Sequence, residues 1–166
     1  MLELDNPCLD CRNKCCVVGL IGLMLSKEEY EAYFKKYEQS FLVIPEDKLV
    51  FLTARDGIIC PYFEDRGCKI YDQRPFDCRL YPYQMRLAYE TKEKIKFILH
   101  SRSDCPRKTN LLLPEAEAKA LIMDFGRKVY GNKKIIVQNC DNLLARLTNK
   151  IEILLVKLFK VLGIVK

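Results

Sequence analysis

The chain has 166 residues, of which 49% are apolar, and its formal net charge is +6. A chain of this length can bury a proper hydrophobic core, so its cysteines are not needed to hold a small coreless fold together. Residues 101–166 contain 13 basic and 6 acidic side chains, whereas residues 1–100 contain 15 and 16. All the basic excess therefore lies beyond the cysteine-rich region, which disfavours a nucleic-acid-binding zinc module.

The N-terminal sequence predicts a cytoplasmic protein. Met1-Leu2-Glu3-Leu4-Asp5 carries acidic residues where a signal peptide carries basic ones, and no apolar segment with a cleavage site follows. In a reducing compartment, clustered cysteines bind metal or act in catalysis more often than they form disulfides. One alternative stays open, because cytosolic proteins of hyperthermophiles can be rich in disulfides. The chain would then be a disulfide-stapled structural protein.

The first 100 residues are predicted to combine one helix with short strands. Residues 1–16 show no helical or strand periodicity and indicate an irregular loop. Ser26-Lys27-Glu28-Glu29 is a capping-box sequence that predicts a helix to about Gln39, with Tyr30, Phe34 and Tyr37 on one face. Short strands are predicted at residues 41–44, 49–53 and 67–71, and a hairpin at 84–89 and 94–100.

Two helices are predicted in the remaining part. Pro114 begins the first and Gly131 ends it. Residues 141–162 carry apolar side chains at a heptad a/d spacing, namely Leu144, Leu147, Ile151, Leu154, Leu158 and Val161. The expected fold class is α+β, with a small antiparallel β region and cysteine-rich loops packed with helices and a long C-terminal amphipathic helix. We expect a cysteine-cluster metal-binding region at 1–110 and a helical region at 111–166 that packs on or extends the same domain.

Eight of the nine cysteines lie in the first 105 residues, and they begin with a C-x2-C-x3-C-C run. A C-x2-C turn places two sulfurs on the same side of one loop, and coordination converts each thiol into a thiolate. The side chains of the neighbouring residues Cys15 and Cys16 diverge, so we expect one to coordinate and the other to face a second centre or the core. The candidate metal ligands are Cys8, Cys11, Cys15, Cys16, Cys60, Cys68, Cys78 and Cys105.

The number and type of ligands limit the metal. One zinc ion and one [4Fe–4S] cluster each take four ligands, so eight thiolates allow two centres, or one centre with spare thiols. His100 is the single histidine, which excludes Cys2His2 and three-histidine zinc sites. Thiolates alone suit both zinc and iron–sulfur clusters. We favour an iron–sulfur cluster because three spaced cysteines near one turn, with distant ones added, are more typical of cluster ligation; zinc stays open.

Three arginines lie beside cysteines in the sequence. Arg12 stands between Cys11 and Cys15, while Arg74 and Arg79 bracket Cys78. Four thiolates around such a metal leave a formal charge of about −2, which a buried site must offset with donors or cations. We expect these arginines to stabilise the negative charge of the ligand sulfurs without binding the metal themselves. Alternatively, they are solvated surface residues.

The cysteine pattern resembles a known family. The N-terminal run, Cys60-Pro61 and the block from Gly67 to Pro82, GCKIYDQRPFDCRLYP, together resemble the YkgJ-like cysteine-cluster family, described as a zinc- or iron-chelating domain. The resemblance covers about residues 5–106 and implies metal or iron–sulfur binding, with no established general reaction. Flagellin lysine methylases carry a similar cysteine block, which implies S-adenosylmethionine-dependent modification as a remote option. Cys140 has no counterpart in the pattern.

Two classes of function remain open. The first is a metal-binding protein with a redox, metal-handling or maturation role. The second is an enzyme that modifies a protein or small molecule, with a structural or electron-donating cluster. The sequence contains no G-x-G-x-x-G, P-loop or H-E-x-x-H motif, and the protein partner, the substrate and the catalytic residues are not identified by sequence.

The C-terminal helix predicts further interactions. Residues 141–165 carry an apolar stripe with lysine and arginine on the other face, which suits a membrane surface or a second copy of the chain. Alternatively, the stripe packs along its own domain with the lysines outward. Lys157 and Lys160 interrupt the apolar sequence too soon for a membrane span.

Overall fold

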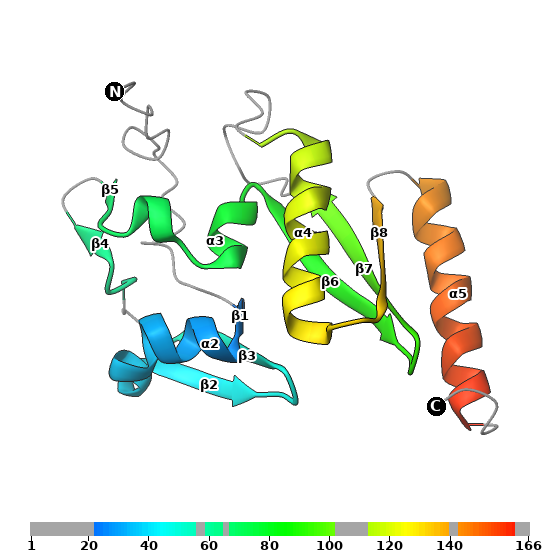
Figure 1. Cartoon of the computed structure of the whole chain (residues 1–166), viewed down its shortest axis with the longest axis horizontal. Helices are drawn as coiled ribbons and strands as arrows, with labels where there is room; N and C mark the ends of the chain where they lie inside the picture. The colour runs from blue at the N-terminus through cyan, green and yellow to red at the C-terminus, as the bar shows by residue number, and fades with distance from the viewer. Residues whose placement is uncertain (1–21, 56–58, 65–66, 102–112, 140–142, 162–166) are drawn as a thin grey trace. The chain divides into compact units, whose positions relative to one another are not determined.

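The structure is a computed structural model that describes residues 22–55, 59–64, 67–101, 113–139 and 143–161 (Figure 1). Helices and small sheets alternate along the chain, which confirms the α+β class. The chain divides into two compact units. The first unit comprises Met1–Arg79 and Cys105–Leu112, and the second comprises Leu80–Asp104 and Leu113–Lys166. The expected division into 1–110 and 111–166 stays a prediction.

The first unit contains a three-stranded antiparallel sheet. Its strands are β1 (Leu23–Ser26), β2 (Phe41–Pro45) and β3 (Leu49–Ala54), in the order β1-β3-β2. The pairs Leu23↔Leu52 and Val43↔Leu52 fix the register of both edge strands against the central strand. Strands β2 and β3 confirm the predicted runs, whereas the sequence analysis does not predict β1.

The predicted helix after Ser26 is present but irregular. It begins as α2 (Lys27–Glu29), continues with π-helical winding as η1 (Tyr30–Phe34) and ends as the 3-10 segment η2 (Lys35–Ser40). Ser26 and Glu29 form the predicted capping box: the Ser26 side chain accepts from the Glu29 amide, and the Glu29 carboxylate accepts from the Ser26 amide.

This helical segment and the sheet enclose the core of the first unit. The side chains of Leu25, Phe34, Phe41 and Leu52 are almost fully buried there. The rings of Phe34 and Phe41 pack edge to face, with centroids 5.7 Å apart. Two of the three aromatic residues predicted on one face, Tyr30 and Phe34, are buried, and the third, Tyr37, packs against the same cluster. The predicted apolar face is therefore confirmed.

The rest of the first unit consists of short elements. Strands β4 (Phe63–Glu64) and β5 (Gly67–Cys68) form a two-stranded antiparallel sheet, followed by the 3-10 turn η3 (Tyr71–Gln73) and by helix α3 (Phe76–Leu80), whose last residue belongs to the second unit. The sequence predicts one strand over 67–71, but pairing ends at Cys68. The chain turns there because the Gln73 amide bonds to the Ile70 carbonyl, which begins η3.

The second unit contains a mixed three-stranded sheet. Strands β6 (Tyr83–Glu90) and β7 (Lys94–Ser101) form the predicted hairpin, with a register shift between Leu87 and Tyr89. Strand β8 (Lys134–Asn139) pairs with β7 in the parallel direction, which the sequence analysis does not predict. The sheet order is β6-β7-β8, so β7 is central, and its residues Ile95 to Leu99 are all buried.

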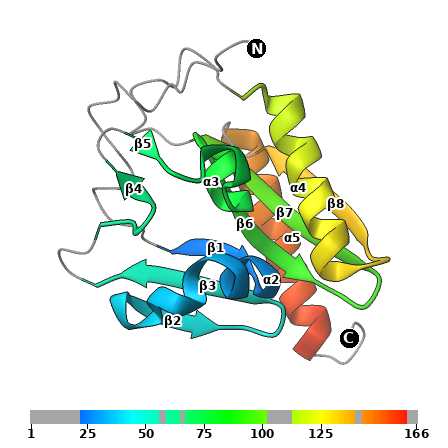
Figure 2. The same cartoon turned by 60° about the vertical axis from the view of Figure 1, so that its left-hand side comes forward.

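Helix α4 (Glu115–Tyr130) packs on this sheet, as Figures 1 and 2 show. Its bounds confirm the helix predicted between Pro114 and Gly131, and Gly131 adopts a positive φ of 64° just beyond the last turn. Gly126 lets the helix approach β8 closely: a Cβ atom at that position would lie 3.0 Å from Cδ1 of Ile135. The close packing of α4 on β8 therefore requires glycine at position 126.

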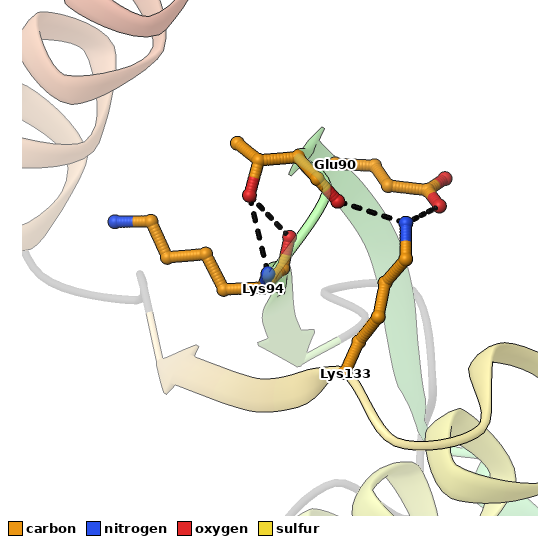
Figure 3. A network of polar contacts seen from close by, with 4 residues as sticks. Glu90, Lys94 and Lys133 are labelled. Atoms are coloured by element: carbon orange, nitrogen blue, oxygen red, sulfur yellow. Dashed lines mark hydrogen bonds and ion pairs between the residues drawn. The ribbon is translucent and has the colours of Figure 1, made fainter. Parts of the chain in front are cut away.

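A polar network joins the β6–β7 turn to the segment before β8 (Figure 3). The Lys133 ammonium contacts the Glu90 carboxylate and donates to the Thr91 carbonyl at 2.8 Å. Thr91 closes the turn, because its hydroxyl and amide both bond to the Lys94 backbone, at 3.1 Å and 2.8 Å. The network holds the connection between α4 and β8 against the hairpin.

Helix α5 (Leu143–Val161) is the last described element, and it contacts β6 of its own unit. No helix in the described ranges is both long enough and apolar enough to cross a membrane.

Candidate metal centre

Cys60 lies at the start of a tight turn in the first unit. The Phe63 amide donates to the Cys60 carbonyl at 2.9 Å, so residues 60–63 form a β-turn with Pro61 at its second position. Proline favours that position because its ring fixes φ. The Cys60 side chain is buried and belongs to the apolar cluster of the first unit. The turn thus places a thiol at the edge of the core.

Cys68 comes to the same cluster through the β4–β5 hairpin. It pairs with Phe63 across the two strands, and the Lys69 amide donates to the Tyr62 carbonyl at 2.9 Å. The side chain of Cys68 is partly buried and packs against the cluster that contains Cys60. An exposed ion pair, Lys69 to Glu64 at 2.8 Å, spans the outer side of the hairpin.

Cys78 lies on helix α3, which two carboxylates attach to the rest of the first unit. Glu29 accepts from the Phe76 amide at 2.6 Å with one oxygen, while its other oxygen accepts from the Ser26 amide at 3.1 Å. Asp77 accepts from the Met24 amide at 3.1 Å. These bonds connect the first turn of α3 to β1 and α2, and Cys78 packs against the same apolar cluster. The three thiols are thereby associated with one core.

Tyr62 stands among these cysteines. Its hydroxyl donates to the Tyr33 carbonyl at 2.6 Å, and its ring packs edge to face with Phe34 and Tyr37. Burial raises the pKa of Tyr62, and the nearby ionisable groups, which include Cys60 and Cys68, raise it further. The apolar cluster with which the cysteines are associated is therefore rich in aromatic side chains.

The two described arginines of the predicted site have different environments. Arg74 donates from Nε to the Tyr71 carbonyl at 2.7 Å, and its guanidinium lies 3.6 Å from the centre of the Tyr71 ring. Arg74 is thus held over the aromatic ring as a cation–π pair. Arg79 is exposed in the last turn of α3. Support of thiolates by Arg74 and Arg79 stays a prediction.

The structure therefore associates three of the eight candidate ligands with one cluster. Cys60, Cys68 and Cys78 are thiols and form no disulfide with one another. No three His, Cys, Asp or Glu side chains converge closely enough to hold a metal ion within the described ranges. The donor chemistry suits zinc or an iron–sulfur cluster, but a complete centre needs further ligands. The remaining candidates lie outside the described residues, namely Cys8, Cys11, Arg12, Cys15, Cys16 and Cys105.

Sequence reasoning missed the residues that place these cysteines. It identified Glu29 only as part of a capping box, yet the same carboxylate also anchors α3. It did not single out Tyr62 or Asp77. The sequence analysis predicts no turn at Cys60-Pro61, although proline there is a local signal for one. The contact between Glu29 and Phe76 joins residues 47 positions apart and leaves no local signal.

Comparison with known proteins identifies the class of this cysteine-rich core. Residues 7–106 match the family model described as "CxxCxxCC: Putative zinc- or iron-chelating domain". The chain belongs to this family, which confirms the family resemblance of the cysteine pattern. Its own run has three residues between the second and third cysteine, where the family's name shows two. Neither the comparison with curated proteins nor that with solved structures gave a match.

Proposed function

We propose that the chain binds a metal through the thiolates of its clustered cysteines, and that the bound group is an iron–sulfur cluster. The observation that carries this proposal is that Cys60 belongs to one apolar cluster against which Cys68 and Cys78 both pack. The proposed centre is completed by cysteines of the N-terminal run or by Cys105, all within the residues that the family model matches.

The chemistry of the donors supports iron or zinc over harder metals. Soft thiolates select zinc, copper(I) and iron–sulfur centres, whereas calcium and magnesium prefer oxygen ligands. The three described cysteines belong to, or pack against, a cluster of aromatic and aliphatic side chains that includes Tyr62 and Leu52. Such surroundings limit solvent access, which is one of the factors that set the reduction potential of a cluster.

The role that follows is the handling of electrons or metal. A thiolate-bound cluster transfers single electrons, or is passed to another protein during maturation, without any catalytic side chain on its host. A reducing, cytoplasmic location belongs to the same proposal, since it keeps the ligand thiols available.

Anaerobic purification followed by quantification of iron, acid-labile sulfide and zinc tests the identity of the group. We expect a brown protein with matched iron and sulfide and a broad visible absorption that bleaches on reduction. Colourless protein with stoichiometric zinc would show that the bound group is zinc rather than an iron–sulfur cluster, and the proposal of a thiolate site would still hold. Protein that holds neither metal after anaerobic purification and reconstitution would contradict metal binding altogether.

A further inference from the structure

Helix α5 exposes large apolar side chains along most of its length. Leu147, Ile151, Leu154, Leu155, Leu158 and Val161 have exposed fractions between 46% and 84%. Successive members are three or four residues apart, except that Leu155 directly follows Leu154, and these positions fall on one side of the helix. A contiguous apolar surface of this kind on a water-exposed helix marks a site of interaction. We call these six residues the α5 stripe.

Basic side chains accompany the α5 stripe. Lys150 and Lys157, both exposed, lie one heptad apart, and their helical positions fall at one edge of the stripe. The sequence 143–161 contains four basic residues and one acidic residue. The helix thus combines exposed apolar surface with an excess of positive charge.

We propose that α5 binds the surface of an anionic membrane, lying in the interface with the α5 stripe inserted and the lysines toward the lipid headgroups. The charge of the helix is complementary to that of anionic lipids, and each lysine near such a surface strengthens binding. The described helices include none that could cross a membrane, so the proposed mode is lying on the bilayer rather than spanning it.

A second copy of the chain fits the α5 stripe less well. In heptad terms Lys150 and Lys157 occupy g positions, and the e positions that a parallel partner would place opposite them, five residues further on, are Leu155 and Leu162, which offer no opposite charge. An antiparallel partner would bring lysine toward lysine. The exposure of Leu155 also makes the apolar surface wider than the narrow a/d seam of a two-stranded coiled coil.

Co-sedimentation of the full chain with vesicles tests this inference. We expect binding to vesicles that contain phosphatidylserine, weaker binding to vesicles of phosphatidylcholine alone, and a decrease as salt is raised. Leu154→Glu should abolish binding. The matched control is Leu42→Glu, because Leu42 is similarly exposed, at 53% against 65%, but lies on strand β2. This control should bind as the unchanged chain does.

The charge contribution is tested separately. Replacement of Lys150 and Lys157 together by glutamine should weaken binding to the anionic vesicles about thirtyfold, at roughly fivefold for each lysine. The same variant should bind phosphatidylcholine vesicles as the unchanged chain does. Circular dichroism establishes that each variant is folded.

Three results would overturn the inference. The first is failure of the folded chain to bind either vesicle. The second is equal loss of binding in Leu42→Glu and Leu154→Glu. The third is a concentration-dependent dimer in light scattering that Leu154→Glu abolishes while no vesicle binds, which would assign the α5 stripe to a second copy. None of these readouts depends on metal content.

Discussion

The Glu29 side chain connects two parts of the first unit that are 47 positions apart in the sequence. One carboxylate accepts from the Ser26 and Phe76 amides, so a local helix cap and the helix that bears Cys78 share a single acceptor. Charge-assisted bonds of this kind are stronger than neutral ones. Local sequence predicts only the first of the two bonds, because the second depends on the tertiary fold.

Glu29→Gln should therefore lower the free energy of unfolding by about 1–3 kcal/mol. The glutamine side chain has one oxygen, so either the Ser26 or the Phe76 amide would face its NH2 group and lose its acceptor. Urea denaturation followed by circular dichroism measures the change. The matched control is Glu28→Gln, because Glu28 is an exposed neighbour in the same turn. It should change the stability by less than about 0.5 kcal/mol. Equal effects of the two substitutions would show that the bridge to α3 contributes nothing.

Tyr30 provides a prediction for alkaline pH. Its ring is buried, its hydroxyl donates to Glu38 at 3.0 Å, and burial followed by this hydrogen bond raises the pKa of Tyr30 above its ordinary value. The unfolded chain ionises first, so the stability from Tyr30 is complete below the ordinary tyrosine pKa of about 10. It is lost as pH rises from there through the folded pKa. A near-ultraviolet titration should show ionisations above the ordinary tyrosine range, and Tyr30→Phe should remove one of them while that of Tyr62 stays.

Glu38→Gln serves as the second variant for this titration. The change removes both the negative charge and the carboxylate acceptor beside Tyr30, two of the causes that raise its pKa. The late ionisation should move toward the ordinary tyrosine range. A titration unchanged in both variants would contradict the assignment to Tyr30.

At the scale of elements, the sequence predicted those helices and strands whose signals lie within a few neighbouring residues. The capping box, the helix between Pro114 and Gly131 and the β6–β7 hairpin each have their signals within a few residues, and all three are present. Strand β1 has only four residues and ends at the Ser26 cap, so no alternation could develop. Strand β8 pairs in parallel with β7 across the whole of α4, and such a crossover leaves no turn signal.

The packing of α4 on β8 gives a test at this scale. Gly126→Val places a branched side chain where even a Cβ atom lies 3.0 Å from Ile135. We expect a loss of about 1–3 kcal/mol in unfolding free energy, because overpacking forces side chains or backbone to shift. Ala120→Val is the control, since Ala120 is exposed on the same helix and should cost only the helix propensity of valine, about 0.6 kcal/mol. Equal losses of unfolding free energy in the two variants would contradict tight packing of α4 on β8 at Gly126.

For the whole molecule, sequence identified the chemistry better than the architecture. Spacing and composition alone predict thiolate ligands and disfavour histidine zinc sites, and the family match supports zinc or iron chelation. The association of Cys60, Cys68 and Cys78 could not be predicted from spacing, because it depends on the Pro61 turn, the β4–β5 hairpin and the anchoring of α3. The proposed metal site thus depends on tertiary contacts that associate distant thiols with one apolar cluster.

The measurement that tests this account most directly is the metal content of two cysteine variants, purified anaerobically beside the unchanged chain. Cys78→Ser should lose most of the bound metal and unfold at lower denaturant, because metal-binding free energy is partly folding free energy. Cys140→Ser changes a cysteine beyond the matched residues 7–106 and should keep the metal content and the stability of the unchanged chain. Full metal content in Cys78→Ser, or equal loss in Cys140→Ser, would contradict a metal centre built on the cysteines of the first unit.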